Sequence, residues 1–528
     1  MAMIIKKQSW NKLVFYGVFG LISTVLMVYY LSNTIIHFTT SQQFPINSLK
    51  RFPLTILIFP AEIFSFCFAL YFVYNLFTDR YRNEKPGKLQ NKQSIKVAVL
   101  LPVFNEPKEI VERTIIACKN LVWPGGVNVY ILDDSTNEID KKNMEMLGRK
   151  YGCSIITRKD RIGYKAGNIN HAVKNHIREY FFVILDSDQA PQPEFLLETM
   201  DYFSDSKAAF VQIPQYFLND KTVLERAAKL GANIFYQSQC VSKARDGAMP
   251  FCGTNVVVRT DVFRKLNGFS YYTSTEDIEL GIRMNEAGYH GVFVPKVLVY
   301  GYAPVDFAAY SSQQFRWANG NLAILRESWP KIMFGNFSLR YQIHTLFTLG
   351  WWMIGIISSI YIIVPVLSLF FGGTHHTWLP TPLLILLFIN VVTGISMIYM
   401  SLKDRIEGEK VRLSDALIQY SLITNSMFIY TRAAVSALFG KYVGFVRTQK
   451  QRSSSGWKHI RLNIFTAILC FGFSMYALYN AATSSDVQGL RTYFPVSIWL
   501  LFYCLILASS IFFVGYQLPT EKLKNFKN

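Results

Sequence analysis

Carboxylate-rich motifs stand at the ends of three apolar runs in the first half of the sequence. They are LPVFNE (101–106), DDST (133–136) and DSD (186–188). Any one of them is also typical of a turn or a helix cap, because Asp, Asn and Ser favour both. Parallel sheets bind ligands at the carboxyl ends of their strands. If the apolar runs are such strands, the motifs predict a polar site along that edge.

The DSD motif has the ligand chemistry of a divalent cation site. Asp186 and Asp188 follow five apolar residues and lie two positions apart, so that a turn can direct both carboxylates at one ion. Mg²⁺ or Mn²⁺ fits this hard oxygen ligand set, with diphosphate oxygens and water completing the shell. The ion would offset charge on a leaving nucleoside diphosphate. Carboxylate pairs of this kind are common, so the motif alone does not establish a site.

A candidate cation and a candidate base follow. Lys165 stands before AGN in the basic run 158–168, where it could reach a phosphate from the same edge, although such a run also suits a solvated patch. In STED (274–277), Asp277 has the chemistry of a general base that removes a proton from an acceptor hydroxyl. Glu276 also fits the N-terminal cap of a helix.

The motif QQFRW (313–317) stands just before a long apolar segment. Arg316 offers a cation for a diphosphate, and Trp317 offers a flat apolar platform for a sugar ring. Trp and Arg near a membrane boundary are also typical interface anchors. The motif therefore supports either a binding site or a membrane anchor.

Strand-like runs alternate with helical periodicity between about 80 and 340. This alternation predicts a soluble α/β domain with a mostly parallel sheet. The predicted strands cover 97–101, 127–132, 154–157, 181–185 and 208–213. The polar motifs then follow the strands, as a ligand site requires.

Membrane-spanning helices are expected on both sides of this domain. The chain has 528 residues, of which 51% are hydrophobic and 17% charged, and its mean hydropathy is +0.20. Such a composition departs from the soluble average. A spanning helix needs about 20 mainly apolar residues. Six segments meet this requirement: 13–31, 53–77, 343–371, 380–402, 461–481 and 493–517.

The charged residues predict the orientation of the chain in the membrane. Lys and Arg number 54 against 35 Asp and Glu, a net charge of +19. The cations gather beside apolar segments, at 6–12, 80–96 and 403–412, which follows the positive-inside rule and argues against nucleic-acid binding. Six crossings then place both termini and the α/β domain in the cytosol. Residues 418–440 contain Arg432, which favours a helix along the inner leaflet over a seventh crossing.

Two other classes of protein receive little support. The seven cysteines are scattered singly without a CxxC spacing, so neither a disulfide framework nor a zinc site is indicated. A transporter or channel, with a soluble domain that only senses a nucleotide sugar, would need ionisable residues within its spans. The predicted spans contain few of them.

In order, the strand-end carboxylates, DSD, FCGTN (251–255), STED and QQFRW resemble the processive family 2 glycosyltransferases of the cellulose-synthase type, over about 95 to 450. The resemblance implies an α/β GT-A domain on the cytosolic face of a transmembrane bundle of about six helices, which forms a polysaccharide channel. The implied layout is two helices in 1–80, the GT-A domain in 81–340, two helices in 341–402, an interfacial helix and gating loop in 403–460, two helices in 461–517 and a cytosolic tail in 518–528.

The resemblance also implies roles for individual residues. Asp277 matches the catalytic base, with Glu276 beside it in the catalytic motif. The remaining matches are Asn105, Glu106, Asp133, Asp134, Lys165, Asp186, Gln313 and Arg316 for the nucleotide sugar, Asp186 and Asp188 for the metal, Cys252, Gly253 and Trp317 for the acceptor, and Phe445, Thr448 and Lys450 for the gating loop. Thr254 and Arg447 depart from the family pattern, which usually has Ser and Val there. A basic loop at the inner leaflet therefore remains an alternative to the gate.

The expected function is inverting, processive synthesis of a β-linked polysaccharide and its translocation across the cell membrane. A β-glucan made from UDP-glucose is the favoured product. Transfer of a single sugar to a lipid, and synthesis of mannan, a chitin-like polymer or a mixed-linkage glucan, remain alternatives because these enzymes share the motifs. The expected cofactor is Mg²⁺ or Mn²⁺. The expected partners are a nucleotide sugar, the growing polysaccharide, the lipid bilayer and, if present, accessory or extracytoplasmic subunits.

Overall fold

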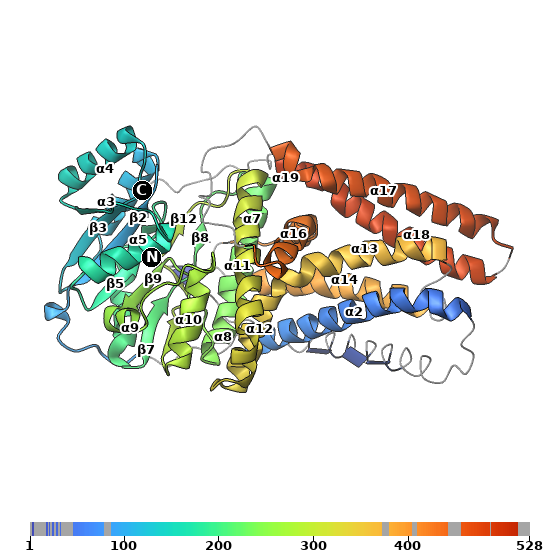
Figure 1. The fold of residues 1–528 in the computed structure, drawn as a ribbon, viewed down its shortest axis with the longest axis horizontal. Helices are drawn as coiled ribbons and strands as arrows, with labels where there is room; N and C mark the ends of the chain where they lie inside the picture. Colours follow the sequence, from blue (N-terminus) through green and yellow to red (C-terminus); the bar gives the residue numbers. More distant parts are fainter. Residues whose placement is uncertain are drawn as a thin grey trace.

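The protein consists of an α/β domain and a bundle of apolar helices, with further helices crossing between them (Figure 1). The computed structural model describes residues 3–4, 46–78, 86–371, 380–403, 409–441, 456–485 and 487–515, with scattered positions between 17 and 32. Helices α7 and α11 lie between the two bodies and run across the direction of the bundle helices (Figure 1). The predicted fold class, a mostly parallel α/β domain joined to an apolar helical bundle, is confirmed.

The main sheet has seven strands in the order β10-β7-β9-β5-β2-β3-β4. They are β2 (Val97–Val103), β3 (Val127–Asp133), β4 (Ser154–Thr157), β5 (Phe181–Ile184), β7 (Ala208–Gln212), β9 (Val256–Arg259) and β10 (His290–Phe293). All five predicted strands are present. Strands β9 and β10 were not predicted from the sequence. Strand β9 runs antiparallel to both of its neighbours, whereas the other pairs are parallel.

Short elements complete the domain. Two small sheets are formed by β6 (Ala190–Pro191), β12 (Val299–Gly301) and β8 (Tyr216–Phe217), and by β1 (Met3–Ile4) with β11 (Lys296–Val297). The helices are α3 (Lys108–Lys119), α4 (Glu138–Tyr151), α5 (Tyr164–Asn175), α6 (Phe195–Thr199), α9 (Thr260–Lys265) and α10 (Glu276–Glu286), with 3-10 turns at Lys92–Ser94 and Met200–Ser204.

Helices cover both faces of the main sheet. Val97, Val99 and Leu101 of β2 pack with α3 and α4 in one apolar cluster. Ala98 and Leu100 of the same strand pack with α5, α9 and α10 in a second cluster. Successive strand residues point to opposite faces. Burial on both faces explains why the strands read as continuous apolar runs.

A second set of helices lies between the domain and the bundle. These helices are α7 (Val223–Ile234), the π-helical turn η3 (Phe235–Gln239), α8 (Cys240–Arg245), α11 (Phe307–Phe334), α12 (Leu339–Gly350), α15 (Leu413–Asn425) and α16 (Met427–Leu438). Thr222 and Glu225 form a reciprocal capping box at the start of α7. The Asp306 side chain caps α11 by accepting from the Ala309 backbone N–H at 2.8 Å.

The bundle contains helices with the length and composition of membrane spans. It consists of α2 (Ile46–Thr78), α13 (Ile354–Phe371), α14 (Pro380–Leu402), α17 (Gly456–Thr483), α18 (Val487–Ala508) and α19 (Ser510–Gly515), with a 3-10 turn at Trp351–Met353 between α12 and α13. Four stretches of the described residues are long and apolar enough to cross a membrane: Leu57–Thr78, Leu339–Phe370, Gly456–Thr483 and Tyr493–Gly515.

These stretches correspond to four of the six predicted spans. Helix α14 coincides with the predicted segment 380–402, and its part Val391–Leu402 is a shorter apolar helix. The predicted span 13–31 lies largely outside the described residues. On α17, apolar side chains such as Phe465 and Ile468 are more than half exposed, as expected of a helix that faces lipid.

The apolar segment 418–440 forms two helices rather than the one predicted. Helices α15 and α16 meet at Ser426. The side chain of Asn425 donates to the Ile506 carbonyl at 2.9 Å and accepts from Asn463 at 2.9 Å, which ties the break to α17 and α18. The location of this segment along the inner leaflet stays a prediction.

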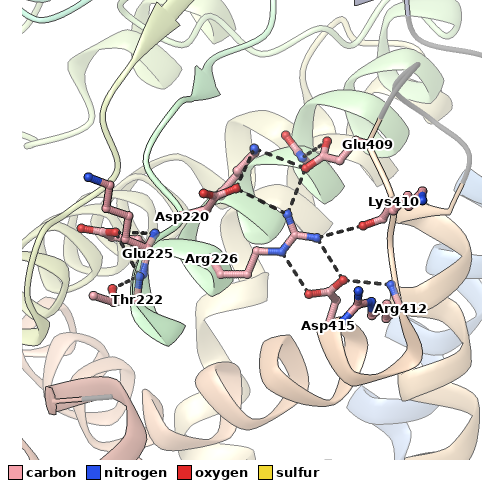
Figure 2. Close-up of polar contacts among 11 residues, drawn as sticks. Asp220, Thr222, Glu225, Arg226, Glu409, Lys410, Arg412 and Asp415 are labelled. Carbon is pink, nitrogen blue, oxygen red and sulfur yellow. Dashed lines mark hydrogen bonds and ion pairs between the residues drawn. The ribbon is translucent and has the colours of Figure 1, made fainter. Parts of the chain in front are cut away.

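A buried ion network joins α7 to the segment that leads into α15 (Figure 2). Arg226 donates to both carboxylate oxygens of Asp415, at 3.0 and 2.9 Å, and its Nη1 lies 3.3 Å from Glu409. Lys229 lies 3.4 Å from Glu409 and 3.6 Å from Asp220. These contacts hold the start of α15 against α7.

Candidate active site

Three strand ends and the start of one reversed strand meet at a single edge of the sheet. Val103 at the end of β2 pairs with Asp133 at the end of β3. At the end of β5, Ile184 pairs with Val256, the first residue of β9. Because β9 runs in the opposite direction, the FCGTN motif that precedes it lies beside the DSD motif that follows β5.

Asn105 connects the first two motifs. It adopts a left-handed backbone conformation with φ of 48°, which Asn tolerates better than most residues. Its backbone N–H donates to the Ser135 hydroxyl at 3.0 Å, and its side-chain oxygen accepts from the Thr136 N–H at 2.9 Å. Glu106 is buried in the same loop. These residues lie at the predicted site, and their contact with a nucleotide stays a prediction.

The two carboxylates of DDST have different environments. Asp134 forms a bidentate pair with Arg158, at 2.8 Å from Nε and 2.6 Å from Nη2, and both side chains are almost fully buried. Asp133 accepts from the Ser135 N–H at 2.9 Å, and burial raises the pKa of its carboxyl group above the usual value. The negative charge of Asp134 is therefore balanced by Arg158 within the fold.

Arg158 was not among the predicted site residues. Besides Asp134, it donates to the carbonyls of Ile162 and Tyr164, at 2.7 and 2.8 Å. These bonds fix the loop that carries Lys165. Its position directly after β4, opposite DDST, is the signal that could have identified it.

Lys165 bridges two motifs that lie far apart in the sequence. Its Nζ donates to Asp186 Oδ1 at 2.5 Å and to the Gly253 carbonyl at 3.1 Å. The Asp186 N–H in turn donates to the Thr254 hydroxyl at 3.0 Å. Thr254, which departs from the family pattern, retains the hydroxyl that a Ser would offer here.

Helix α3 holds the DSD loop by its backbone. The Thr114 hydroxyl donates to the Ser187 carbonyl at 2.8 Å, and Arg113 donates to the Asp188 carbonyl at 2.6 Å. Within the described parts of the chain, no three His, Cys, Asp or Glu side chains gather as a metal cage. Mg²⁺ commonly takes one or two carboxylates and completes its shell with substrate phosphates and water. The pair Asp186 and Asp188 fits a metal shared with a ligand.

The FCGTN loop is fixed from β7 by a residue that the sequence analysis missed. The fully buried Gln212 accepts from the Cys252 N–H at 3.2 Å and donates to the carbonyls of Thr254 and Asn255, at 2.8 and 3.1 Å. A Gln that ends an apolar strand gives no local signal, since its partners in the FCGTN loop follow 40 residues or more later in the chain.

Asp277 lies directly against Gly253. A Cβ atom built on Gly253 would stand 2.7 Å from Asp277 Oδ2, so only glycine leaves room for this carboxylate. Gly253 also has φ of +68°, which favours glycine. The other carboxylate oxygen of Asp277 accepts from the Ile278 N–H at 2.8 Å, at the N-terminus of α10.

The carboxyl groups of Glu276 and Asp277 are adjacent in the first turn of α10. Burial raises the pKa of both groups, and for Glu276 the Asp277 charge raises it further. Lys165 and Arg316 act in the opposite direction on both. A carboxyl group with a raised pKa is a stronger base when it is ionised.

Helix α11 brings QQFRW to the STED loop. Gln313, Arg316, Trp317 and Gly320 recur at helical spacing and share one face. The Ser274 hydroxyl donates to the Arg316 carbonyl at 2.9 Å.

Gly320 allows the close contact between the two elements, because an added Cβ would lie 2.6 Å from the Thr275 hydroxyl. The neighbouring Gln314 faces the other way and accepts from the Tyr430 hydroxyl of α16 at 3.0 Å.

The structure thus places the predicted residues of LPVFNE, DDST, DSD, FCGTN, STED and QQFRW around one site. Lys165 and Gly253 lie at its centre, between Asp186 and Asp277. The predicted gating residues Phe445, Thr448 and Lys450 lie outside the described residues.

Residues 181–395 match the model of the glycosyltransferase family group 2. The matched segment includes DSD, FCGTN, STED and QQFRW, whereas LPVFNE, DDST and Lys165 precede it.

Curated relatives point to the same family. The chain is 29% identical over 253 residues to a cellulose synthase catalytic subunit (UDP-forming) of Xanthomonas axonopodis pv. citri (strain 306), which covers 46% of this chain and 34% of the relative. It is 31% identical over 249 residues to the cellulose synthase 1 catalytic subunit (UDP-forming) of Komagataeibacter xylinus, covering 45% and 32%. It is 31% identical over 248 residues to a probable glucomannan 4-beta-mannosyltransferase 6 of Oryza sativa subsp. japonica, covering 45% and 43%. The matches span less than half the length of these relatives.

A solved structure, the mannosyltransferase PcManGT from Pyrobaculum calidifontis in complex with GDP-Man and Mn2+, aligns with 75% of this chain and 100% of its own, with a TM-score of 0.47 and 13% identity. The family model and the cellulose synthase relatives identify a family 2 glycosyltransferase. The chain is similar to the cellulose-synthase-like members of that family, as its motifs predicted. Its four candidate spans agree with a membrane protein.

Proposed function

We propose that this protein is an inverting, processive glycosyltransferase that polymerises a β-linked polysaccharide and passes it into its own membrane bundle. The observation that carries the proposal is the packing of Asp277 against Gly253, beside the Lys165–Asp186 pair. Helix α11 adds Arg316 and Trp317 next to the STED loop, and the chain continues from α11 through α12 into the apolar bundle. In this proposal the donor site, the acceptor site and the exit path are adjacent.

In the proposed reaction, Asp277 acts as the base. It takes the proton of an acceptor hydroxyl while that oxygen forms a bond to the anomeric carbon of the donor sugar. The bond from this carbon to the diphosphate oxygen breaks, and the electron pair leaves with the nucleoside diphosphate. Attack opposite the leaving group inverts the configuration, so an α-linked donor gives a β-linked product. The raised pKa of Asp277 favours this role.

Cationic side chains would stabilise the leaving group. The charges of Lys165 and Arg316 both lower the pKa of the Asp277 carboxyl group, which supports a role for both cations at the proposed place of transfer. Asp186 and Asp188 would hold Mg²⁺ or Mn²⁺ together with the diphosphate oxygens, which supplies further neutralisation of that charge. Asp133, Asn105 and Glu106 would line the nucleotide side of the same edge.

The donor is proposed to be UDP-glucose and the product a β-glucan. Two bacterial relatives are cellulose synthases described as UDP-forming, which supports a uridine nucleotide. The rice relative, a glucomannan mannosyltransferase, supports a mannose-containing polymer as the second candidate. The site would face the cytosol of a multi-pass protein in the cell membrane. Phe445, Thr448 and Lys450 would close over bound nucleotide.

The test is synthesis by the purified protein in lipid vesicles supplied with labelled UDP-glucose and Mg²⁺. We expect a labelled polymer that a β-glucan-specific glycosidase digests. A parallel reaction with GDP-mannose tests the second candidate. A product with one sugar attached to a lipid would contradict processive synthesis, and a polymer formed only from other donors would contradict the glucan assignment.

A further inference from the structure

A buried carboxylate lies where two candidate membrane spans meet the α/β domain. Asp246 directly follows α8, and its side chain has no exposed surface. One oxygen accepts from the Tyr74 hydroxyl of α2 at 2.5 Å and lies 2.9 Å from Nε2 of His344 in α12. The other oxygen faces Arg245 and Arg340, at 3.6 and 3.5 Å. The partners of this carboxylate therefore come from α8 and from two spans.

The same contacts extend into the bundle. Nδ1 of His344 lies 2.9 Å from the Tyr71 hydroxyl, and the Tyr71 ring stacks on Phe347 with ring centres 4.2 Å apart. Burial alone would raise the pKa of Asp246, but hydrogen bonds from Tyr74 and His344 lower it below the usual value. A buried charge that is held ionised by specific donors fixes those donors in place.

The chain runs from Asp246 to the acceptor loop along one face of α10. The Asn285 side chain donates to the Gly247 carbonyl at 3.3 Å. Gly281 allows Phe251 to approach, since an added Cβ would lie 3.1 Å from it.

One turn further on, Asp277 meets Gly253, where an added Cβ would lie 2.7 Å from the carboxylate. The α10 residues 277, 281 and 285 are four apart and share a face. Segment 246–253 thus follows α10 from its end to its N-terminus, where the candidate base lies.

We propose that Asp246 is a positioning residue that couples α2 and α12 to the acceptor loop and, through α10, to Asp277. The inference rests on the proposed function. It adds a set of contacts through which the candidate membrane helices position the end of the acceptor polysaccharide. Asp246 touches neither of the residues proposed to react. Its effect is therefore on acceptor placement and polymer length rather than on donor binding.

The test uses the full chain in lipid vesicles with Asp246→Asn, which keeps the shape and removes the charge. We expect turnover to fall about ten- to a hundredfold, since small misplacements at a reacting centre have effects of this size. We also expect shorter polymers, with the KM for the nucleotide sugar unchanged within about twofold. Tyr74→Phe, which removes one donor from α2, should show the same pattern more weakly.

The matched control is Thr78→Ala. It removes a 2.5 Å hydrogen bond between the Thr78 and Ser242 hydroxyls, which also joins α2 to α8 but does not involve Asp246. This variant should keep wild-type polymer length. Equal effects of Thr78→Ala and Asp246→Asn would reduce Asp246 to a packing role and overturn the proposal.

Hydrogen exchange gives a readout that does not depend on the product. Asp246→Asn should speed amide exchange in 246–253 and in α10, whereas Thr78→Ala should leave both unchanged. Unchanged exchange and unchanged turnover in Asp246→Asn would overturn the inference. Failure of the wild-type protein to make any polymer would instead contradict the proposed function, while the exchange experiment would still decide the coupling.

Discussion

The candidate active site and the ion network between α7 and α15 contain similar residues but balance their charges differently. In the network, Arg226 lies within 4 Å of Asp220, Glu409 and Asp415, and Lys229 lies within 4 Å of Asp220 and Glu409, with most of the side-chain surface buried. Desolvation lowers the pKa of Arg226 and Lys229, but the carboxylates more than offset it and hold both pKa values above the usual range.

In the site, two of the carboxylates stand next to each other. Asp134 and Asp186 are matched by Arg158 and Lys165, but Glu276 and Asp277 share one helix turn, and burial raises the pKa of both. Perturbed carboxyl groups of this kind cluster at functional sites. The comparison teaches that compensated charges hold elements together, whereas crowded carboxyl groups mark the place where a proton can move.

The sharpest test of this difference is Asp277→Asn. Removal of a general base should lower the rate of sugar transfer about 10²–10⁴-fold, with little change in folding because the amide can still accept from the Ile278 N–H. The measurements are the initial rates of nucleoside diphosphate release and of polymer formation.

Glu286→Gln is the matched control, because it makes the same chemical change at the other end of α10, where Glu286 pairs with Lys331 on the surface. It should leave the rate unchanged. A rate above about one tenth of wild type in Asp277→Asn would contradict its assignment as the base.

The second test concerns a cation within the site. Lys165→Met removes the only side-chain amine that bridges Asp186 and Gly253 in the described structure. We expect kcat to fall about 10²–10³-fold, as for the loss of one preorganised donor at a developing charge, and the KM for the nucleotide sugar to rise. Steady-state kinetics measure both.

Lys159→Met, at an exposed position of the same basic run, serves as the control and should behave as wild type. If both substitutions gave equal losses, the run would act as a general basic patch and not through Lys165.

The third test moves to the ion network. Asp415→Asn weakens the bidentate pair with the largely buried Arg226 and should lower stability by about 1.5–3 kcal/mol, the usual range for hydrogen bonds to charged groups. It should leave the KM and kcat of the folded protein close to wild type. Thermal unfolding in detergent and steady-state kinetics measure the two effects.

A double variant sharpens this result. Replacing Arg226 by Met together with Asp415 by Leu should cost less than the sum of the single changes, since no unpaired buried charge remains. Strict additivity would show that the pair does not act as a unit. A fall in kcat without loss of stability in Asp415→Asn would mean that the network takes part in catalysis. The network and the candidate active site would then not differ in function.

The residues of the candidate site differ in how far the sequence could predict them. The strands and the motifs after them were predictable, because apolar runs and the polar residues that end them are local patterns. Asp133, Asp186 and Asp277 are therefore among the residues that the sequence predicts for the site. Arg158 and Gln212 are not, since their roles depend on which strand lies beside which.

Non-local contacts also explain the errors in the helices. The break at Ser426 is invisible in an apolar pattern that continues across it, because Asn425 is held by Ile506 and Asn463, 81 and 38 residues away. The antiparallel direction of β9 also depends on non-local contacts. Its apolar sequence indicates a strand, but its direction follows from the pairs it forms with β5 and β7.

The smallest expected effect is a dependence of stability on pH at Glu276. Burial and the Asp277 charge raise the pKa of Glu276 in the folded state above that of the unfolded chain, where Glu titrates near about 4.3. Above that pH the folded protein binds more protons at this group than the unfolded protein does. The folded state therefore loses stability relative to the unfolded chain as the pH rises from the unfolded pKa through the raised pKa. Glu276→Gln, which stays neutral, should gain stability relative to wild type as pH rises.

The measurement is the difference in melting temperature between Glu276→Gln and wild type at pH 5 and at pH 8. We expect the variant to be favoured more at pH 8. A difference in melting temperature that does not change with pH would contradict the raised pKa of Glu276, and it would remove the physical basis for choosing the crowded carboxyl groups as the place of proton transfer.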